Sequence, residues 1–139
     1  KGEVDNIPYL LNELILSSFS YYDLTKEKDY QILIVTLLDL LFDEYIVKSE
    51  VNNSRGRCDI MLYPKRRDIP GIIIELKKSR ARKKLTKLQL EKLAKEALLQ
   101  IKNQDYIEKL RLKNIDDIFI CGIAFWEKNS LSVFEKIES

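Results

Sequence analysis

The chain has 139 residues, with 24 Lys and Arg against 22 Asp and Glu, two Cys and no His. This length suits one domain with a single core, and 45% apolar with 33% charged residues is typical of a soluble globular protein. The absence of histidine excludes Ser-His-Asp triads, imidazole general bases and histidine-containing zinc sites. Any catalysis must therefore rest on carboxylates and lysines, with or without a hard metal ion.

Cysteine usage and hydropathy predict an intracellular, cytoplasmic protein. Cys58 and Cys121 stand alone in apolar stretches, as buried thiols in a reducing compartment do. The longest apolar run, Ile32 to Leu38, is too short to cross a bilayer, and no charged-then-apolar leader opens the chain. The chain starts at Lys1 without Met, so we expect one domain over residues 1–139 that forms the C-terminal part of a longer protein.

The net charge of +2 hides an uneven distribution. From Arg55 to Lys95 there are 14 Lys and Arg against four acids, which gives +10, so the remaining 10 basic and 18 acidic residues give −8. Such polarity in a small domain predicts a face that meets polyanions. The alternative is a set of solvated helix and loop surfaces with no partner.

Two helices are expected to open the fold. Residues Ile7 to Phe19 carry apolar side chains at the spacing of an amphipathic helix. After a break at Ser20 to Asp23, Thr25 is a candidate N-cap for a second helix that runs to Phe42. That helix is heavily apolar, so we expect burial on most of its sides.

Three strands are expected next, over Tyr45 to Val51, Arg57 to Tyr63 and Gly71 to Lys77. The residues between the first two, Asn52 to Gly56, are typical of a turn. The run Ile72-Ile73-Ile74 indicates burial on both faces and hence a central place in the sheet. The short connections favour an antiparallel meander.

The second half predicts a long helix from about Thr86 to Asn103, then one or two helical turns over Tyr106 to Leu112. A buried strand over Asp117 to Phe125 follows, and Ser130 to Ile137 is expected as a strand or a short helix. The expected inner stripe of the long helix is Leu88, Leu90, Leu93, Ala94, Ala97, Leu98 and Ile101. The whole order is ααβββαβ, an α/β domain.

Three charged residues lie on neighbouring predicted strands. Glu75 and Lys77 are two residues apart, so they share one face of their strand. If the two strands pair, Asp59 can lie on that face too. An ionised carboxylate after three isoleucines needs a cation or hydrogen-bond donors, because burying it alone costs several kcal/mol.

Two explanations fit these charges. The first is a structural salt bridge between Glu75 and Lys77 or a nearby Arg. The second is a site in which two carboxylates hold Mg²⁺ or Mn²⁺, with open positions for water and a phosphate oxygen. A lysine beside that site can orient the water and offset charge, in place of a histidine. This second arrangement, in which two carboxylates, a metal ion and a lysine lie together, suits hydrolysis of phosphodiester bonds.

Five segments in order resemble motifs of the PD-(D/E)XK nuclease superfamily, and more narrowly the branch often found C-terminal to an AAA-ATPase-like domain. They cover most of the chain: Ser20 to Asp23 with Glu27 and Tyr30; Gly56-Arg57-Cys58-Asp59-Ile60; Ile73-Ile74-Glu75-Leu76-Lys77; Ala97 with Gln100-Ile101 and Tyr106; and Gly122 to Phe125. Cys58 stands where the family's name-giving proline would be, and Gln31 and Asn52 also depart from the branch's pattern.

The resemblance implies a restriction-endonuclease-like αβββαβ core, with a mixed central sheet flanked by helices. It also implies catalytic and metal-binding roles. Asp59, Glu75, the backbone carbonyl of Leu76 and Glu27 would bind the metal, Lys77 would position the nucleophilic water, and Gln100 would support the site from the following helix. The alternative for Glu27 is a surface acid at a helix N-terminus.

A basic stretch directly follows the candidate site, with seven Lys and Arg in the eleven residues from Lys77 to Lys87. It predicts contact with a phosphate backbone and little sequence preference, because no reading helix or interleaved aromatic accompanies it. The expected nucleic-acid-binding residues are Arg55, Arg57, Lys78, Arg80, Arg82, Lys83 and Lys84, and Lys65, Arg66 and Arg67 are expected to extend the same surface. The alternative is a solvated loop.

Together these observations predict a divalent-metal-dependent nuclease domain that hydrolyses DNA, with DNA favoured over RNA as its partner and no membrane. By the resemblance, it would leave a 5′-phosphate and a 3′-hydroxyl. One alternative is a catalytically silent nuclease fold that binds nucleic acid or a protein. Another is an unrelated α/β domain, in which Asp59 and Glu75 would lie far apart.

Overall fold

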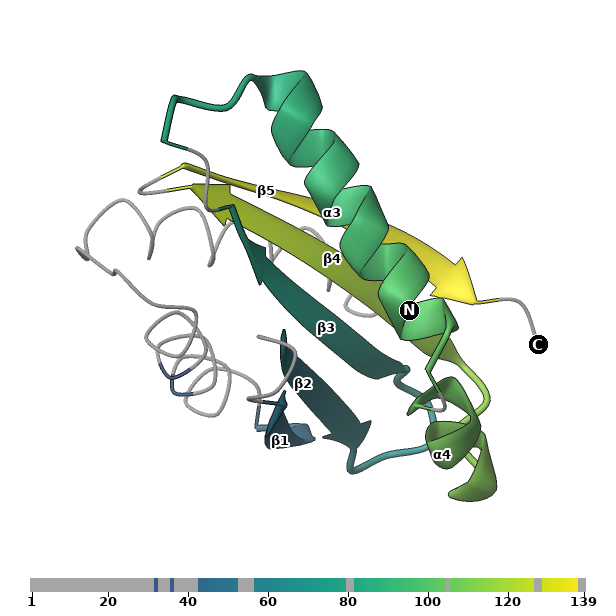
Figure 1. Ribbon diagram of the computed structural model, residues 1–139. Helices are drawn as coiled ribbons and strands as arrows, with labels where there is room; N and C mark the ends of the chain where they lie inside the picture. The colour runs from purple at the N-terminus through teal and green to yellow at the C-terminus, as the bar shows by residue number, and fades with distance from the viewer. Residues whose placement is uncertain are drawn as a thin grey trace.

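The computed structural model describes residues 32, 36, 43–52, 57–79, 82–104, 106–126 and 129–137, and for residues 49–52 and 57–59 it describes the backbone alone. These residues form one five-stranded mixed sheet with two helices (Figure 1). The elements are β1 (Tyr45–Asn52), β2 (Arg57–Pro64), β3 (Gly71–Lys78), α3 (Lys87–Lys102), α4 (Tyr106–Leu112), β4 (Ile118–Trp126) and β5 (Asn129–Ile137).

The strands lie in the order β1-β2-β3-β4-β5. The pairs β1–β2 and β2–β3 are antiparallel, which confirms the predicted meander. The pair β3–β4 is parallel because α3 and α4 carry the chain back between these strands, and β4–β5 is antiparallel again. The predicted fold class, an α/β domain with a mixed sheet and helices, is confirmed.

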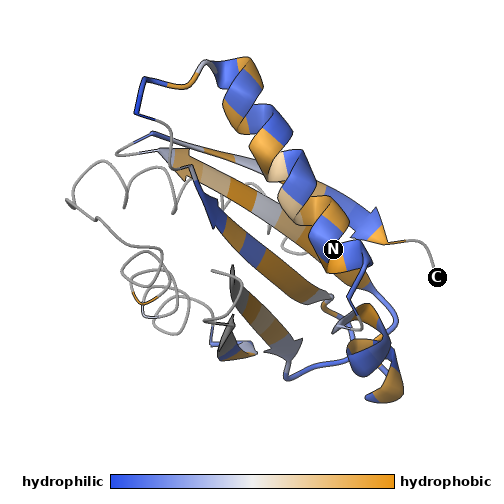
Figure 2. Cartoon of the chain, in the orientation of Figure 1, coloured by the Kyte–Doolittle hydropathy of each residue, from blue (hydrophilic) through white to orange (hydrophobic). Residues whose placement is uncertain are grey.

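β3 is the central strand, as its apolar run predicts. Ile72, Ile73 and Ile74 are all buried, and strands on both sides satisfy the β3 backbone. Figure 2 shows β3 as mainly hydrophobic, with hydrophilic residues toward the end that leads to α3. Burial of both faces therefore explains why this strand does not alternate between apolar and polar residues.

α3 begins where a capping box satisfies its first amide groups. The Thr86 hydroxyl accepts from the Gln89 N–H at 3.1 Å, and the Thr86 N–H donates to the Gln89 side chain at 2.8 Å. The helix buries Leu90, Ala94, Ala97, Leu98 and Ile101, in agreement with the predicted stripe.

The prediction for Leu88 is wrong, because its side chain is 78% exposed. Leu88 precedes Ala97 by nine residues, which is about 180° around a helix of 3.6 residues per turn, so it lies on the opposite face. Leu93 is half-buried and packs beside the cluster formed by Leu90, Ala94 and Ala124.

α3 lies against β3, β4 and β5 on one face of the sheet (Figure 1). At Gly122 of β4 the two elements approach so closely that an added Cβ would lie 2.2 Å from the Ala94 carbonyl oxygen. It would also lie 3.0 Å from the Leu98 nitrogen. A residue without a side chain is therefore required here, and Gly122 is the register partner of Glu75.

Two buried polar groups keep their protons in this core. Cys121 of β4 is fully buried, as predicted for a thiol, and that burial raises the pKa of Cys121. The Tyr45 hydroxyl donates to the Pro70 carbonyl oxygen at 2.7 Å, and burial also raises the pKa of Tyr45. This hydrogen bond fastens β1 to the loop that leads into β3.

Several predictions fall outside the described residues. They concern the two opening helices, of which Ile32 and Thr36 alone are described, both helical and exposed, and the side chain of Cys58. The last predicted element is a strand, β5, rather than a short helix. Within the described part of the chain, no helix is both long and apolar enough to cross a membrane.

Candidate active site

Glu75 is the buried acid around which the site is built. It lies in the middle of the central strand with 1% of its surface exposed, although the neighbouring residues of β3 are apolar. A carboxylate in such a place needs hydrogen-bond donors or a cation, because the loss of hydration costs several kcal/mol. The surrounding side chains supply a donor from α3.

Gln100 of α3 connects Glu75 to Lys77. With its amide nitrogen facing the carboxylate, Gln100 donates to Glu75 Oε2 at 3.0 Å, and its oxygen accepts from Lys77 Nζ at 3.0 Å. The reverse orientation would set oxygen against oxygen and nitrogen against nitrogen. Three of the residues singled out from the sequence therefore form one hydrogen-bonded chain.

A second residue of α3, Glu96, also contacts Lys77. Its carboxylate lies 3.7 Å from Lys77 Nζ, and the side chains are 48% and 29% exposed. Glu96 precedes Gln100 by four residues, so the two share one face of the helix. Glu96 was not singled out from the sequence, because its spacing from Gln100 indicates a shared helix face but not a contact with Lys77.

The strand register places Asp59 directly opposite Glu75 in the antiparallel pair β2–β3. Directly opposed positions lie on the same face of a sheet. The alternative of an unrelated domain required these two residues to be far apart, and this register contradicts it.

The donor set has the chemistry of a site for a hard divalent ion. Two opposed carboxylate positions and the neighbouring backbone carbonyl of Leu76 would offer oxygen donors, which Mg²⁺ and Mn²⁺ prefer. Among the described side chains there is no cluster of three or more Asp, Glu, Cys or His that could hold a metal. The side chain of Asp59 and the whole of Glu27 lie outside the described set.

Those predicted nucleic-acid-binding residues that the structure describes lie near the end of β3 that carries Lys77. Lys78 is half-buried at the end of this strand, and Arg82, Lys83 and Lys84 are exposed in the connection to α3. Arg57 begins β2 at the same end of the β2–β3 pair. Arg55 and Arg80 lie outside the described residues.

Lys65, Arg66 and Arg67, which were expected to extend this surface, lie at the other end of β3 and do not continue the basic stretch directly. These residues follow β2 and precede Gly71, so they lie at the start of β3, whereas the basic stretch follows its end. The two ends of an eight-residue strand are about 23 Å apart. The antiparallel turn therefore separates two basic groups that are close in sequence.

Comparison with known proteins agrees with this geometry. The family model of the PD-(D/E)XK nuclease superfamily matches residues 25–135. A search of the curated proteins found no match. The match covers most of the chain and includes the five described strands except for the last residues of β5. The matched region therefore contains Glu75 and Lys77 on the central strand of the mixed sheet. The chain therefore belongs to the PD-(D/E)XK nuclease superfamily.

Proposed function

We propose that this domain is a divalent-metal-dependent deoxyribonuclease that cuts phosphodiester bonds with little sequence preference of its own. The observation that carries the proposal is the hydrogen-bonded chain from buried Glu75 through Gln100 to Lys77, with Asp59 opposite Glu75 in the register. Superfamily members typically use divalent metals, and the oxygen donors here suit them.

Asp59, Glu75 and the Leu76 carbonyl would hold Mg²⁺ or Mn²⁺, with Glu27 as a further ligand. When bound, such an ion supplies Lewis-acid chemistry and offsets negative charge on a phosphate group. Gln100 keeps the Glu75 carboxylate in one orientation by donating to Oε2. The buried setting of Glu75 strengthens these electrostatic interactions because little water screens them.

Lys77 would orient the attacking water and balance charge on the phosphate. Its ammonium group donates to Gln100 at 3.0 Å and lies 3.7 Å from Glu96, so α3 fixes its position. The side chain is 29% exposed, which leaves it accessible to a substrate at the end of β3. The exposed bases Arg82, Lys83 and Lys84 would contact the backbone of the same substrate.

Cleavage assays test this proposal. Linear duplex, circular duplex, single-stranded DNA and RNA are incubated with Mg²⁺, Mn²⁺ or EDTA. We expect cleavage of DNA that requires the metal and that falls about 100-fold or more in Lys77→Ala, since positioned proton-transfer groups contribute at least that much. Asp59→Asn and Glu75→Gln should lose activity while keeping the volume of each side chain.

Glu91→Gln is the matched control, because Glu91 lies on α3 and pairs with Lys95, away from Lys77. It should cleave like the wild type, and melting curves should show that every variant is folded. Activity that persists in EDTA, or in both Lys77→Ala and Asp59→Asn, contradicts the proposal. Salt-sensitive DNA binding without cleavage in any metal favours a silent binding module instead.

The narrower predictions extend the same proposal. An association with an AAA-ATPase-like domain and a place at the C-terminal end of a longer chain stay predictions. They would explain how the domain is directed to its substrate. Sequencing the complete reading frame checks both.

A further inference from the structure

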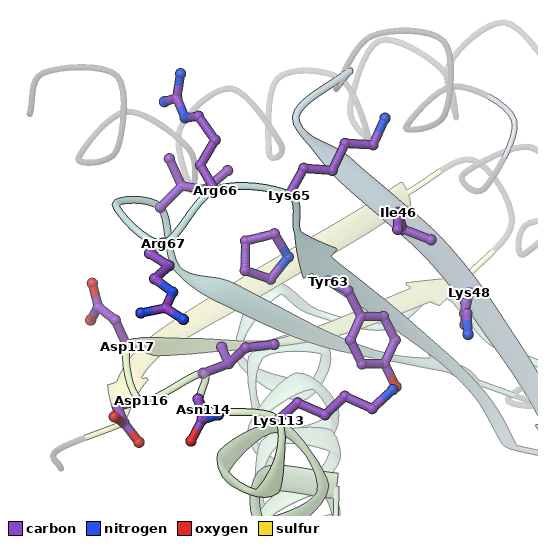
Figure 3. Close-up of a pocket in the computed structure, with 13 residues that line it drawn as sticks. Ile46, Lys48, Tyr63, Lys65, Arg66, Arg67, Lys113, Asn114, Asp116 and Asp117 are labelled. Carbon is purple, nitrogen blue, oxygen red and sulfur yellow. The ribbon is translucent and has the colours of Figure 1, made fainter.

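A second basic site lies near the start of β3, at the opposite end of this strand from Lys77 and the basic stretch. A cavity of about 360 Å³ is formed by β1, β2, the β2–β3 turn and the segment between α4 and β4 (Figure 3). Its charged lining residues are Lys48, Lys65, Arg66, Arg67, Lys113, Asp116 and Asp117. Five bases against two acids make the pocket cationic.

The charge is not evenly balanced within this pocket. Arg66 lies 3.0 Å from Asp68 and 3.5 Å from Glu44, and Asp117 lies 3.9 Å from Lys136. Neither Lys48 nor Lys113 forms an ion pair with any described carboxylate. Among the described residues, Lys65 and Arg67 also form no ion pair, so the lining of the pocket keeps a net positive charge.

Tyr63 brings these two lysines together. Lys48 Nζ lies 5.5 Å and Lys113 Nζ 4.4 Å from the centroid of the Tyr63 ring. The ammonium groups are thus at most 9.9 Å apart, the sum of those two distances. Figure 3 shows Lys113 extending toward Tyr63 and Lys48 beside the Tyr63 ring on β1, with Asp116 and Asp117 on the other side of the pocket. An anion placed here would relieve the repulsion between like charges.

This cluster lies on the same face of the sheet as the candidate active site. Positions 59, 61 and 63 alternate onto one face of β2, Asp59 is opposite Glu75, and Lys48 is opposite Met61. Four residues of an antiparallel strand span about 14 Å.

We propose that the cluster of Lys48, Tyr63 and Lys113 binds a backbone phosphate of the substrate nucleic acid, at a distance from Asp59 of about 14 Å along β2. This inference rests on the proposed function and extends it to substrate positioning. The two lysines hold the phosphate, and the Tyr63 ring keeps them close together. Nothing in this cluster reads a base, so the contact adds affinity without sequence preference.

A DNA-binding assay under conditions that prevent cleavage tests the proposal. Fluorescence anisotropy measures the affinity for a duplex of about 20 base pairs in EDTA over a range of salt concentrations, for wild type and the Lys48→Gln/Lys113→Gln variant. We expect the log-log salt slope to become shallower by about 0.9 for each phosphate that the variant no longer neutralises. In cleavage assays the same variant should show a raised KM and an unchanged kcat.

Lys102→Gln/Lys109→Gln is the matched control, since it removes the same charge outside the pocket. Lys102 pairs with Glu135, and Lys109 lies 5.1 Å from the Tyr106 ring, so this control also removes a cation–π interaction. The control should keep the wild-type slope. If both double variants change the slope equally, the effect is one of net charge and the inference fails.

The outcomes also separate this inference from the proposed function. If wild type binds and cuts DNA but the pocket variant keeps the wild-type slope and KM, the inference alone is overturned. If wild type neither binds nor cuts DNA, the proposed function has failed as well. If the variant loses binding of adenosine triphosphate while duplex binding is unchanged, the pocket serves a small phosphorylated ligand and the inference is overturned.

Discussion

Gln100 determines how the two charged side chains of β3 are used. An amide can donate to a carboxylate and accept from an ammonium group at once, which no charged side chain can do. Its bonds of 3.0 Å to Glu75 and Lys77 therefore hold both groups in one arrangement without adding a third charge. Partners of this kind fix the orientation of the groups that carry out chemistry.

Replacing Gln100 with Ala should lower kcat about 10- to 100-fold, the usual effect of losing a supporting hydrogen bond at a metal site. KM should change little, because Gln100 lies behind Glu75 and Lys77. Steady-state cleavage at saturating Mg²⁺ measures both constants, and a Mg²⁺ titration should show weaker activation in the variant.

The adjacent Leu99→Ala variant is the control for truncation of this helix, since Leu99 is exposed. It should cleave like the wild type. A Gln100→Ala enzyme with wild-type kcat and wild-type Mg²⁺ dependence would remove the positioning role from Gln100.

The sequence indicated Glu75 and Lys77 because an acid inside an apolar run is conspicuous, and period-two alternation assigns both to one face. Glu96 was not predicted because nothing in its sequence surroundings makes it conspicuous. It is one of several acids on an exposed helix surface, and its contact with Lys77 depends on how α3 is placed across the sheet. Spacing within a helix cannot specify that placement.

The packing of α3 against β4 brings Gln100 to Glu75. Gly122 permits that packing, because a Cβ at this position would lie 2.2 Å from a backbone oxygen of α3. Glu75 is paired with Gly122 in the parallel register, so this close approach of the helix occurs beside the buried acid. The lack of a side chain at Gly122 thus allows α3 to take this position on the sheet.

Gly122→Ala should destabilise the domain by about 3 kcal/mol, the upper part of the range for overpacked cores, because the obstacle is backbone that cannot rotate away. Urea denaturation measures the free energy of unfolding. Cleavage should fall as well, since a displaced α3 carries Gln100 away from Glu75.

Gly71→Ala provides a matched comparison on β3. An added Cβ there meets side-chain atoms, Cγ2 of Ile115 at 2.9 Å and Cδ1 of Leu110 at 3.3 Å, and side chains shift more readily than the backbone oxygen that opposes a Cβ at Gly122. We expect a cost of about 1 kcal/mol and nearly normal cleavage. Equal costs for the two variants would contradict this explanation of the α3 packing.

At the scale of the whole molecule, two groups of basic residues that the structure describes lie at the two ends of β3. The basic stretch with Arg82, Lys83 and Lys84 follows the end of β3, and the pocket around Tyr63 lies near its start. The net charge of +2 reveals neither group. A long polyanion could contact both ends, whereas a mononucleotide could not.

Substitution of Arg82, Lys83 and Lys84 by Gln should weaken duplex binding uniformly across sequences and make the salt slope shallower by up to about 2.7, or 0.9 for each phosphate left without its cation. Anisotropy titrations in EDTA with duplexes of different sequence measure this. The folded structure should be unaffected, because these side chains are exposed. A variant with the wild-type slope would favour the alternative of a solvated loop.

The sequence by itself determined the described elements, the central place of β3 and the identity of its buried charges. These follow from local periodicity, capping and the cost of burying a carboxylate, as Ile72 to Ile74, Thr86 and Glu75 illustrate. The tertiary structure alone decided that Glu96 meets Lys77, that Leu88 faces solvent, and that Lys65 to Arg67 lie away from Lys83. These features depend on the rotation of α3 against the sheet and on the reversal between β2 and β3, because contacts between distant segments are set by packing and not by spacing along the chain.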